Sequence, residues 1–403
     1  MTSAIRRRRT ALFVLFLIPG LLLASWVTRT PDIRDLLNAS TSEMGMILFG
    51  LSLGAMLGVL ASGRLVTRFG TRPVIIVGFV LVYLGFLAIA GASTASLAMG
   101  VFAGLLLFGL GMGLSDIAIN IEGAELETTT RRPLLPALHG CFSLGTLVGS
   151  LISLGLTYLS LSVFWHLILM GATTLLPCLW ACFAIPSGTG QTLTAKGAEQ
   201  QPTTAPFKPW KDKTLIMIGL IVLALALAEG SATDWLPLLM VDGHGFDPAS
   251  SALVYAGFTT AMTIGRFSGT YILQRFSREA VIRASAVSGA LGIALVSFSD
   301  NPVLAAASVL FWGLGASLGF PVGISAAGES GEQPAKRVAA VATVGYLAFL
   351  IGPPSLGFIG QAYGLRMAMV VVLVLVATTV LLAPAVRGSR ASTPNQIKGT
   401  CHE

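Results

Sequence analysis

The stretch 109–127, "GLGMGLSDIAINIEGAELE", places a carboxylate and an amide within an otherwise apolar run. Asp116 and Asn120 are four residues apart, so they share one face of a helix and can contact each other. A charged side chain at the centre of a bilayer costs roughly 2.5–3.5 kcal/mol on insertion scales, so it must be protonated, paired or exposed to a water-filled cavity. A change between these surroundings would bind or release a proton. Asp116 is therefore a candidate proton-coupling group.

Two further polar residues extend this candidate set. Counting residues from the predicted helix ends places His139 and Arg266 at the depth of Asp116, in the half of the membrane nearer the basic loops. We expect a polar layer of Asp116, Asn120, His139 and Arg266, in which His139 relays a proton. The structural alternatives are a fixed Asp116–Arg266 pair and simple hydrogen bonds between helices for His139 and Asn120.

Polar and aromatic residues also lie toward the other side of the membrane. Glu229 lies about 24 Å along its helix, which predicts a position in the outer half and a role as a second proton or substrate group. Asp234, beside Trp235, is predicted near the outer surface, either as a cavity group or as a solvated helix end. Trp26 and Arg29 lie at the outer end of the first helix, where Trp26 is either an interface anchor or a stacking surface for a ring-shaped solute.

Composition places all of these residues in a membrane. Of the 403 residues, 54% are apolar and 11% are charged, whereas a soluble domain has about 25% charged residues. About 20 apolar residues span the roughly 30 Å hydrocarbon core. The apolar runs predict an all-α protein of twelve spanning helices, near 11–29, 42–62, 73–92, 97–121, 135–157, 163–185, 214–237, 249–274, 280–298, 302–326, 337–360 and 364–386.

The basic residues predict the orientation of these helices. With twelve spans, all but four of the 25 Lys and Arg residues fall on one side of the membrane, the exceptions being Arg29, Arg34, Arg266 and Arg366. By the positive-inside rule this side is cytoplasmic, and both termini lie there. The net charge of +7 is thus explained by orientation, and no nucleic-acid partner is expected.

The chain divides into two similar halves. Residues 186–213 are polar and rich in Pro, Thr and Gln, which predicts a cytoplasmic linker between bundles at 1–185 and 214–403. "FGLGMGL" (108–114) matches "WGLGASL" (312–318), and "RFGTR" (68–72) matches "RFSR" (275–278). A parallel repeat of six spans is typical of carriers with a substrate site between two bundles. Glycines four apart within 50–58 and 315–323 predict close helix packing, which would also suit sliding bundles.

The loop "GRLVTRFGTRP" (63–73) resembles the signature between helices two and three of the major facilitator superfamily. Gly63, Arg68, Gly70 and Arg72 fit that signature, but Thr67 occupies the position of its acid, so the usual charge latch is in doubt. The stretches 19–37, 228–246 and 312–321 are similar to one bacterial inner-membrane member of the family. These resemblances imply the twelve-helix facilitator fold, a transporter and a bacterial inner-membrane location.

A shorter resemblance concerns the mechanism. Asp116-Ile-Ala-Ile-Asn120 is similar to the acid-x-x-x-Asn pattern on helix four of proton-coupled fucose-type permeases, whose acid belongs to the sugar and proton site. We therefore expect proton-coupled symport of a small polar, sugar-like organic solute. The alternatives are proton-antiport efflux of drugs or metabolites, and a non-transporting membrane sensor built on the same scaffold.

Other classes of function lack their motifs. The sequence has no nucleophile–base set, no HExxH pair and no phosphate-binding loop, which argues against an enzyme or an ATP-driven pump. We expect no cofactor and no metal. The expected partners are a small-molecule substrate, the proton and the lipid bilayer, and the expected oligomeric state is a monomer.

Overall fold

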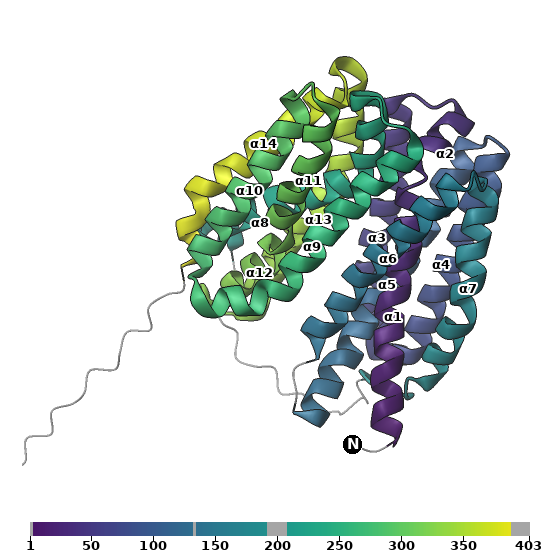
Figure 1. The fold of residues 1–403 in the computed structure, drawn as a ribbon. Helices are drawn as coiled ribbons and strands as arrows, with labels where there is room; N and C mark the ends of the chain where they lie inside the picture. The colour runs from purple at the N-terminus through teal and green to yellow at the C-terminus, as the bar shows by residue number, and fades with distance from the viewer. Residues whose placement is uncertain (1–2, 132–133, 192–207, 388–403) are drawn as a thin grey trace, which may run out of the picture.

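The computed structural model describes residues 3–131, 134–191 and 208–387. All the regular elements in this part of the chain are helices (Figure 1). Its elements are α1 (Ser3–Val27), α2 (Thr30–Leu37), α3 (Thr41–Phe69), α4 (Thr71–Thr94), α5 (Ala98–Thr130), α6 (Leu135–Tyr158), α7 (Val163–Ala184), η1 (Pro209–Lys211), α8 (Lys213–Leu238), η2 (Leu239–Gly243), α9 (Pro248–Arg275), α10 (Arg278–Phe298), α11 (Pro302–Ser317), α12 (Gly319–Glu329), α13 (Pro334–Tyr363), α14 (Leu365–Leu382) and η3 (Ala383–Val386).

These elements form twelve spans, which confirms the predicted fold. Within the described ranges, eleven helical segments are long and apolar enough to cross a membrane, and α11 with α12 counts as one of them. The twelfth span is α9, whose 28 residues extend about 42 Å. Its sequence is less apolar than the others because it carries Arg266 and several hydroxyl side chains.

Several helix boundaries differ from the expectation, among them the start of α1 at Ser3 and the end of α3 at Phe69. The helix α5 continues to Thr130, because "GAELE" after the apolar run consists mainly of good helix formers. The segment after α1 forms a separate short helix, α2, with Pro31 in its first turn. The tenth span is broken at Leu318, between α11 and α12. Apolar runs mark the hydrocarbon depth and do not show where polar helical turns continue beyond it.

Two helix starts follow from local sequence. Ser40 caps α3 through a capping box, in which its hydroxyl accepts a hydrogen bond from the Glu43 N–H at 3.3 Å and the Glu43 carboxylate accepts one from the Ser40 N–H at 2.8 Å. Asp247 caps α9, accepting from the N–H groups of Ala249 and Ser250 at 3.0 Å. Hydrogen bonds from Ser250 hold the pKa of Asp247 below its ordinary value.

Each half of the chain packs as its own bundle. The helices α1 to α7 form one group and α8 to α14 the other (Figure 1). Glycines explain the closest approach, of α3 to α5. A Cβ atom on Gly54 would lie 2.1 Å from the Leu106 carbonyl oxygen, and one on Gly58 would lie 2.4 Å from that of Leu110. The predicted glycine face of helix two therefore packs inside one half and is not a surface between the halves.

The two halves meet along α3 and α13, and along α6 and α9. We call the end of the molecule where α1 begins, with its run Arg6–Arg9, the basic end, and the end that carries α2 the far end. At the far end Arg34 of α2 forms an ion pair with Asp242 of η2. There the backbone N–H of Ser42 also donates to the Gln361 side chain at 3.4 Å.

The far end is closed, whereas the charged contacts of the basic end do not cross between the halves. A Cβ atom on Gly357 of α13 would lie 2.9 Å from the Cα of Gly45 on α3, so the two helices touch backbone to backbone at the far end. At the basic end, the described ion pairs join elements of the same half. The ribbons of the two halves converge toward α2 and diverge toward the N-terminus (Figure 1).

Candidate functional site

The centre of α5 holds a short hydrogen-bonded chain that ends at Asp116. The Asn120 amide donates to the Asp116 carboxylate at 3.1 Å and to the Asp116 carbonyl oxygen at 2.9 Å. The Asn120 amide oxygen lies 3.0 Å from Nε2 of His139 on α6, so this ring nitrogen carries the proton that it donates. The Phe16 ring of α1 packs edge-on against the His139 ring, with centroids 5.2 Å apart.

The structure brings three residues of the predicted polar layer, Asp116, Asn120 and His139, into one hydrogen-bonded chain, and Arg266 is not part of that chain. Asp116 and Asn120 are half-buried, and His139 is exposed although it lies within a spanning helix. Among the described residues, Asp116 has no ion pair. Tyr346, on α13 of the other half, lies close enough to Asp116 to interact with it electrostatically. The acid is therefore placed where both halves can affect its charge.

A second cluster connects α6 with α8 and α9. The Arg266 guanidinium donates to the Glu229 carboxylate at 2.7 Å and to the Ser143 hydroxyl at 3.0 Å. The Thr263 hydroxyl donates to the Ser143 carbonyl oxygen at 3.2 Å. Ser143 follows His139 by one helical turn, so the two clusters are neighbours along α6. Arg266 thus belongs to the predicted polar layer, but through Ser143.

One structural alternative and one expectation about this layer are wrong. Arg266 pairs with Glu229, not with Asp116. Glu229 therefore lies in the same layer as Arg266 and not in a separate outer layer. Counting residues from helix ends treats the helices as upright and level with one another. The span that contains Glu229 continues to Gly243, beyond its expected end at 237, so Glu229 lies nearer the middle of the span, and the reach of two long side chains closes the remaining offset.

Asp234 is buried, which contradicts the expectation of a solvated helix end. Its residue surface is 7% exposed, because α8 continues beyond it and passes directly into η2. The neighbouring Trp235 is fully buried and its indole N–H has no hydrogen-bond partner. Its ring lies 3.2 Å from where a Cβ of Gly357 would be, at the seam with α13.

Trp26 and Arg29 are also buried, within the first half. Trp26 is 0% exposed, so the expectation of a membrane-interface anchor is wrong. Arg29 donates to Nδ1 of His166 at 2.8 Å, to Asp32 at 2.9 Å and to the Leu161 carbonyl oxygen at 2.7 Å. In this conformation its guanidinium joins the end of α1 to α2, to α7 and to the turn between α6 and α7, and it is already fully engaged.

The signature loop at the basic end has an unusual arrangement of charge. Gly70 joins α3 to α4 at a φ of +85°, which glycine adopts readily. The Arg68 guanidinium lies 5.1 Å from the ring centroid of Phe69, and that of Arg72 lies 5.4 Å from that of Phe183. A Cβ on Gly63 would contact nothing within 4 Å.

Sequence reasoning missed the acid that works beside this loop. Thr67, at the position of the usual acid, donates its hydroxyl to the Arg64 carbonyl oxygen within its own helix, at 2.9 Å. Instead Glu122 of α5, which is 0% exposed, accepts hydrogen bonds from the Thr71 hydroxyl and from Arg8 of α1. Two features of the sequence could have indicated this pair: an acid less than two helical turns after Asp116, and the basic run at the N-terminus.

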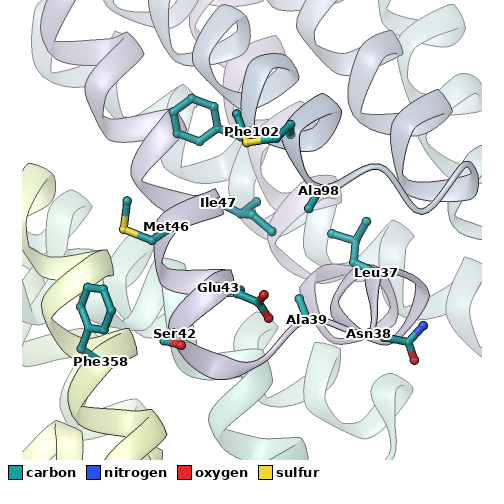
Figure 2. Close-up of a pocket in the computed structure, with 11 residues that line it drawn as sticks. Leu37, Asn38, Ala39, Ser42, Glu43, Met46, Ile47, Ala98, Phe102 and Phe358 are labelled. Atoms are coloured by element: carbon teal, nitrogen blue, oxygen red, sulfur yellow. The ribbon is translucent and has the colours of Figure 1, made fainter.

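A groove of about 490 Å³ lies at the far end, away from the Asp116 chain. Figure 2 shows its walls, which come from α2, α3, the start of α5 and α13. Met46 of α3 and Phe358 of α13 line it from opposite halves, and Glu43 supplies its charge. This groove marks the seam of the closed far end.

Comparison with known proteins agrees with this architecture. The sequence profile of the Major Facilitator Superfamily matches residues 10–346. An uncharacterised MFS-type transporter of Yersinia pestis is 29% identical over 373 residues, which cover 92% of this chain and 94% of that protein.

Solved structures give the same result for the fold. The nucleoside transporter NupG has a TM-score of 0.73 at 17% identity, over 94% of this chain and 98% of that one. The D-xylose–proton symporter has a TM-score of 0.72 at 15% identity, over 95% and 97% of the two chains. The twelve spans, the two bundles and the profile match together show that the chain belongs to the Major Facilitator Superfamily of membrane transporters.

Proposed function

We propose that this protein is a secondary carrier that couples a proton to the symport of a small polar organic solute. The observation that carries the proposal is Asp116. It lies in mid-span, it has no cationic partner among the described residues, and an amide and an imidazole connect it to α6. A neutral amide lets the acid gain and lose a proton without breaking an ion pair.

Burial of the charge gives the coupling its physical basis. An ionised Asp116 enclosed by both halves would carry the cost of an intramembrane charge, roughly 2.5–3.5 kcal/mol. At 1.36 kcal/mol per tenfold, this cost disfavours the switch of the unprotonated carrier by roughly 70- to 400-fold. The protonated form avoids the cost, so a proton accompanies the solute. His139, hydrogen-bonded to Asn120, is the proposed path between Asp116 and water.

The proposed moving parts are the two halves, residues 1–185 and 214–403, joined by the cytoplasmic linker 186–213. The positive-inside pattern supports a cytoplasmic basic end, with both termini there, in a bacterial inner membrane. With the far end closed, the described conformation would then face the cytoplasm. The hydrogen bond of Arg266 to Ser143 crosses from one half to the other, and Glu229 is the ion-pair partner of Arg266 within the second half. Glu229 is therefore a further candidate proton group, which becomes exposed when α6 and α9 separate.

The proposed solute class rests on likeness. One solved structure of the same fold is described as a nucleoside transporter and another as a D-xylose–proton symporter. Polar side chains from both halves supply the donors and acceptors that such hydroxylated solutes need. In the outer part of the site, Asp234, Trp235 and Trp26 are the proposed additional contacts, whereas Arg29 is already engaged by its own half.

Transport in proteoliposomes tests the proposal. A thermal-shift screen with sugars and nucleosides first identifies a solute that stabilises the folded protein. With that solute, Asp116→Asn is expected to lose proton-driven accumulation while retaining exchange of labelled solute across the membrane. Glu125→Gln, an exposed acid on the same helix, is the matched control and should accumulate solute normally. Uphill accumulation by Asp116→Asn at the wild-type level would refute the coupling role of Asp116.

The relay through His139 needs a separate measurement. His139→Ala is expected to slow proton uptake and to change the pH dependence of transport, with solute exchange at fixed pH preserved. A wild-type pH profile in this variant would exclude His139 from the proton path and would leave Asp116 untouched.

A further inference from the structure

The carboxylates inside the membrane fall into two kinds. In the described part of the chain, four acids lie two or more turns inside the spanning segments, namely Asp116, Glu122, Glu229 and Asp234. Glu122 is paired with Arg8, and Glu229 with Arg266. Asp116 and Asp234 have no ion pair among the described residues. Each half of the molecule therefore contributes one acid without a cation.

Asp234 is the more isolated of these two acids. Asp116 accepts a hydrogen bond from Asn120, whereas no described side chain or backbone group donates to the Asp234 carboxylate. Its residue surface is 93% buried. Tyr255 of α9 faces it closely enough to interact electrostatically, and that ring is itself fully enclosed, with Phe258 stacked beside it.

Most cations near the centre and the far end of the elements packed against α8 are engaged elsewhere. The pairs are Arg266 of α9 with Glu229, Arg34 of α2 with Asp35 and Asp242, Arg29 beside α2 with Asp32, Arg337 of α13 with Asp212, and Arg366 of α14 with Asp300. The cations without a carboxylate among the described residues, such as Arg275 of α9, Lys336 of α13 and Lys211 of η1, lie at the basic end, away from Asp234. The nearest acid on α8 itself, Glu229, adds negative charge. Ionised Asp234 would therefore be a buried charge without compensation, which proteins avoid by neutralising the group.

We propose that Asp234 is a second proton-binding site and that its carboxyl group is protonated in this conformation with the far end closed. The site is distinct in depth from Asp116. Asp234 lies nine residues before the end of η2, about 13 Å from the far end, whereas Asp116 lies 18 residues, about 27 Å, from the start of α5. Asp234 is thus placed to take up a proton when the far end opens.

The role of this proton in transport rests on the proposed function. Opening the far end separates Arg34 from Asp242 and removes α13 from Trp235, which would admit water to Asp234. The carboxyl group would then exchange its proton with the far side. Closure would enclose it again in the neutral form. On this scheme Asp234 exchanges its proton with the far side alone, so the pH on that side controls the closure of the far end, and Asp116 supplies the proton that crosses the membrane.

Infrared titration of the full-length protein in lipid membranes tests the site without a known solute. Protonated carboxyl groups have a carbonyl band that ionised ones lack. At neutral pH, Asp234→Asn is expected to lose one protonated carboxyl per chain from this band, and Asp234→Glu is expected to retain one at a shifted position. Asp300→Asn, an exposed acid of the same half that is paired with Arg366, is the matched control and should leave the band unchanged.

The outcomes separate the two proposals. An unchanged band in Asp234→Asn shows that Asp234 is ionised and overturns the inference. A lost component in Asp234→Asn supports it, whatever Asp116→Asn does to the band. Should Asp234→Asn fold poorly, the Asp234→Glu variant decides alone, because a band identical to wild type would then also overturn the inference. Failure of Asp116→Asn to affect transport bears on the proposed coupling group and not on Asp234.

Discussion

The fourth span of the first half and its counterpart in the second half share a glycine-rich sequence but differ in chemistry. In α5 the run "FGLGMGL" continues as unbroken helix to Asp116 and Asn120. In the second half "WGLGASL" ends at a break at Leu318, and Phe320 and Ile324 occupy the corresponding positions. The Phe320 ring packs against Tyr346, with centroids 6.5 Å apart.

The second half places its charge on other helices. Glu229 and Asp234 lie on α8 and Arg266 on α9, so its polar groups face the seam from the seventh and eighth spans. The repeat therefore preserves the scaffold of spans while each half distributes its ionisable groups independently. This asymmetry gives one half an acid linked to an imidazole and the other half an ion pair and an isolated acid.

The largest effect is expected from breaking the ion pair of the second half. Arg266→Ala leaves Glu229 partly buried without its cation, which for buried pairs costs roughly 3–5 kcal/mol. We expect the lower end of that range, because the two side chains remain 23% and 18% exposed. The measurement is the thermal unfolding midpoint in detergent. The double variant Glu229→Gln/Arg266→Gln should recover most of the loss, and a double variant as unstable as Arg266→Ala would show that charge is not the cause.

Much of the scaffold was predictable because its causes are local. Spans follow from apolar runs of membrane length, and the Asp116–Asn120 contact follows from a spacing of four residues. Equal counts on either side of a turn expected near 127–128 predict His139 level with Asp116. Because α5 continues to Thr130, His139 instead contacts Asn120, one helical turn from Asp116. These features can be predicted from the geometry of one helix or of one helical hairpin, without knowing how distant helices cross.

The missed features depend on crossings between distant helices. The partner of Arg266 is decided by how α8, α9 and α6 meet. The pair of Arg8 and Glu122 joins residues 114 apart in sequence, which no periodicity reveals. The burial of Asp234 depends on the elements that cover α8 at the far end. Each of these contacts is tertiary, so the amino-acid pattern of a single helix does not specify it.

A smaller effect is expected where one glycine from each half closes the far end. In Gly357→Val the added Cβ would lie 2.9 Å from the Cα of Gly45, and such overpacking costs about 1–3 kcal/mol. This would shift the population away from the far-end-closed state by roughly 5- to 160-fold. Labelling of a cysteine introduced at Ser42 from the far side should increase accordingly. Gly63→Ala, which has open space around its Cβ, is the control, and equal labelling in both variants would contradict the assigned seam.

Removing the N-terminal cap of α8 should lower the stability of the fold modestly and in a pH-dependent way. Asp212 accepts from the Leu215 N–H at 3.0 Å and from Arg337 at 2.6 Å. Burial alone would raise the pKa of Asp212, but these hydrogen bonds outweigh it and the pKa is lowered. Because the pKa of Asp212 is lower in the folded state, its ionised carboxylate stabilises the fold at pH values above its unfolded pKa, which is about 4. This stabilisation is lost as the pH falls through the pKa of the folded state.

Two variants at Asp212 separate the cap from the charge. Asp212→Ala removes both and should cost about 0.5–2 kcal/mol, the usual value of a helix cap. Asp212→Asn keeps a capping acceptor and should cost less, but it should lose the decline in unfolding midpoint at acidic pH. Identical midpoints for the two variants at neutral pH would show that the cap contributes nothing. The unfolding midpoint measured across a series of pH values checks both statements.

The smallest effect on stability is expected from the ion pairs of the basic end, where the arginines of the two halves have different partners. Arg278 of the second half binds Glu329 through two hydrogen bonds, of 2.7 and 2.6 Å. In the first half the corresponding Arg72 lies over the Phe183 ring instead, and Glu125 is exposed. Because Glu329 is 56% exposed, Glu329→Gln should lower stability by at most about 1 kcal/mol, and added salt should remove the difference.

Glu125→Gln should change nothing in the same unfolding assay, since its carboxylate has no ion pair among the described residues. A loss in Glu329→Gln that persists at high salt would mean that the pair contributes packing rather than charge. Equal losses in Glu125→Gln and Glu329→Gln would mean that the signature arginines of the two halves work alike after all. In that case Arg72 would form an ion pair with Glu125, and no longer contact Phe183, in the conformation that dominates in solution. The difference between the two halves at the basic end would then be a property of one conformation of the carrier.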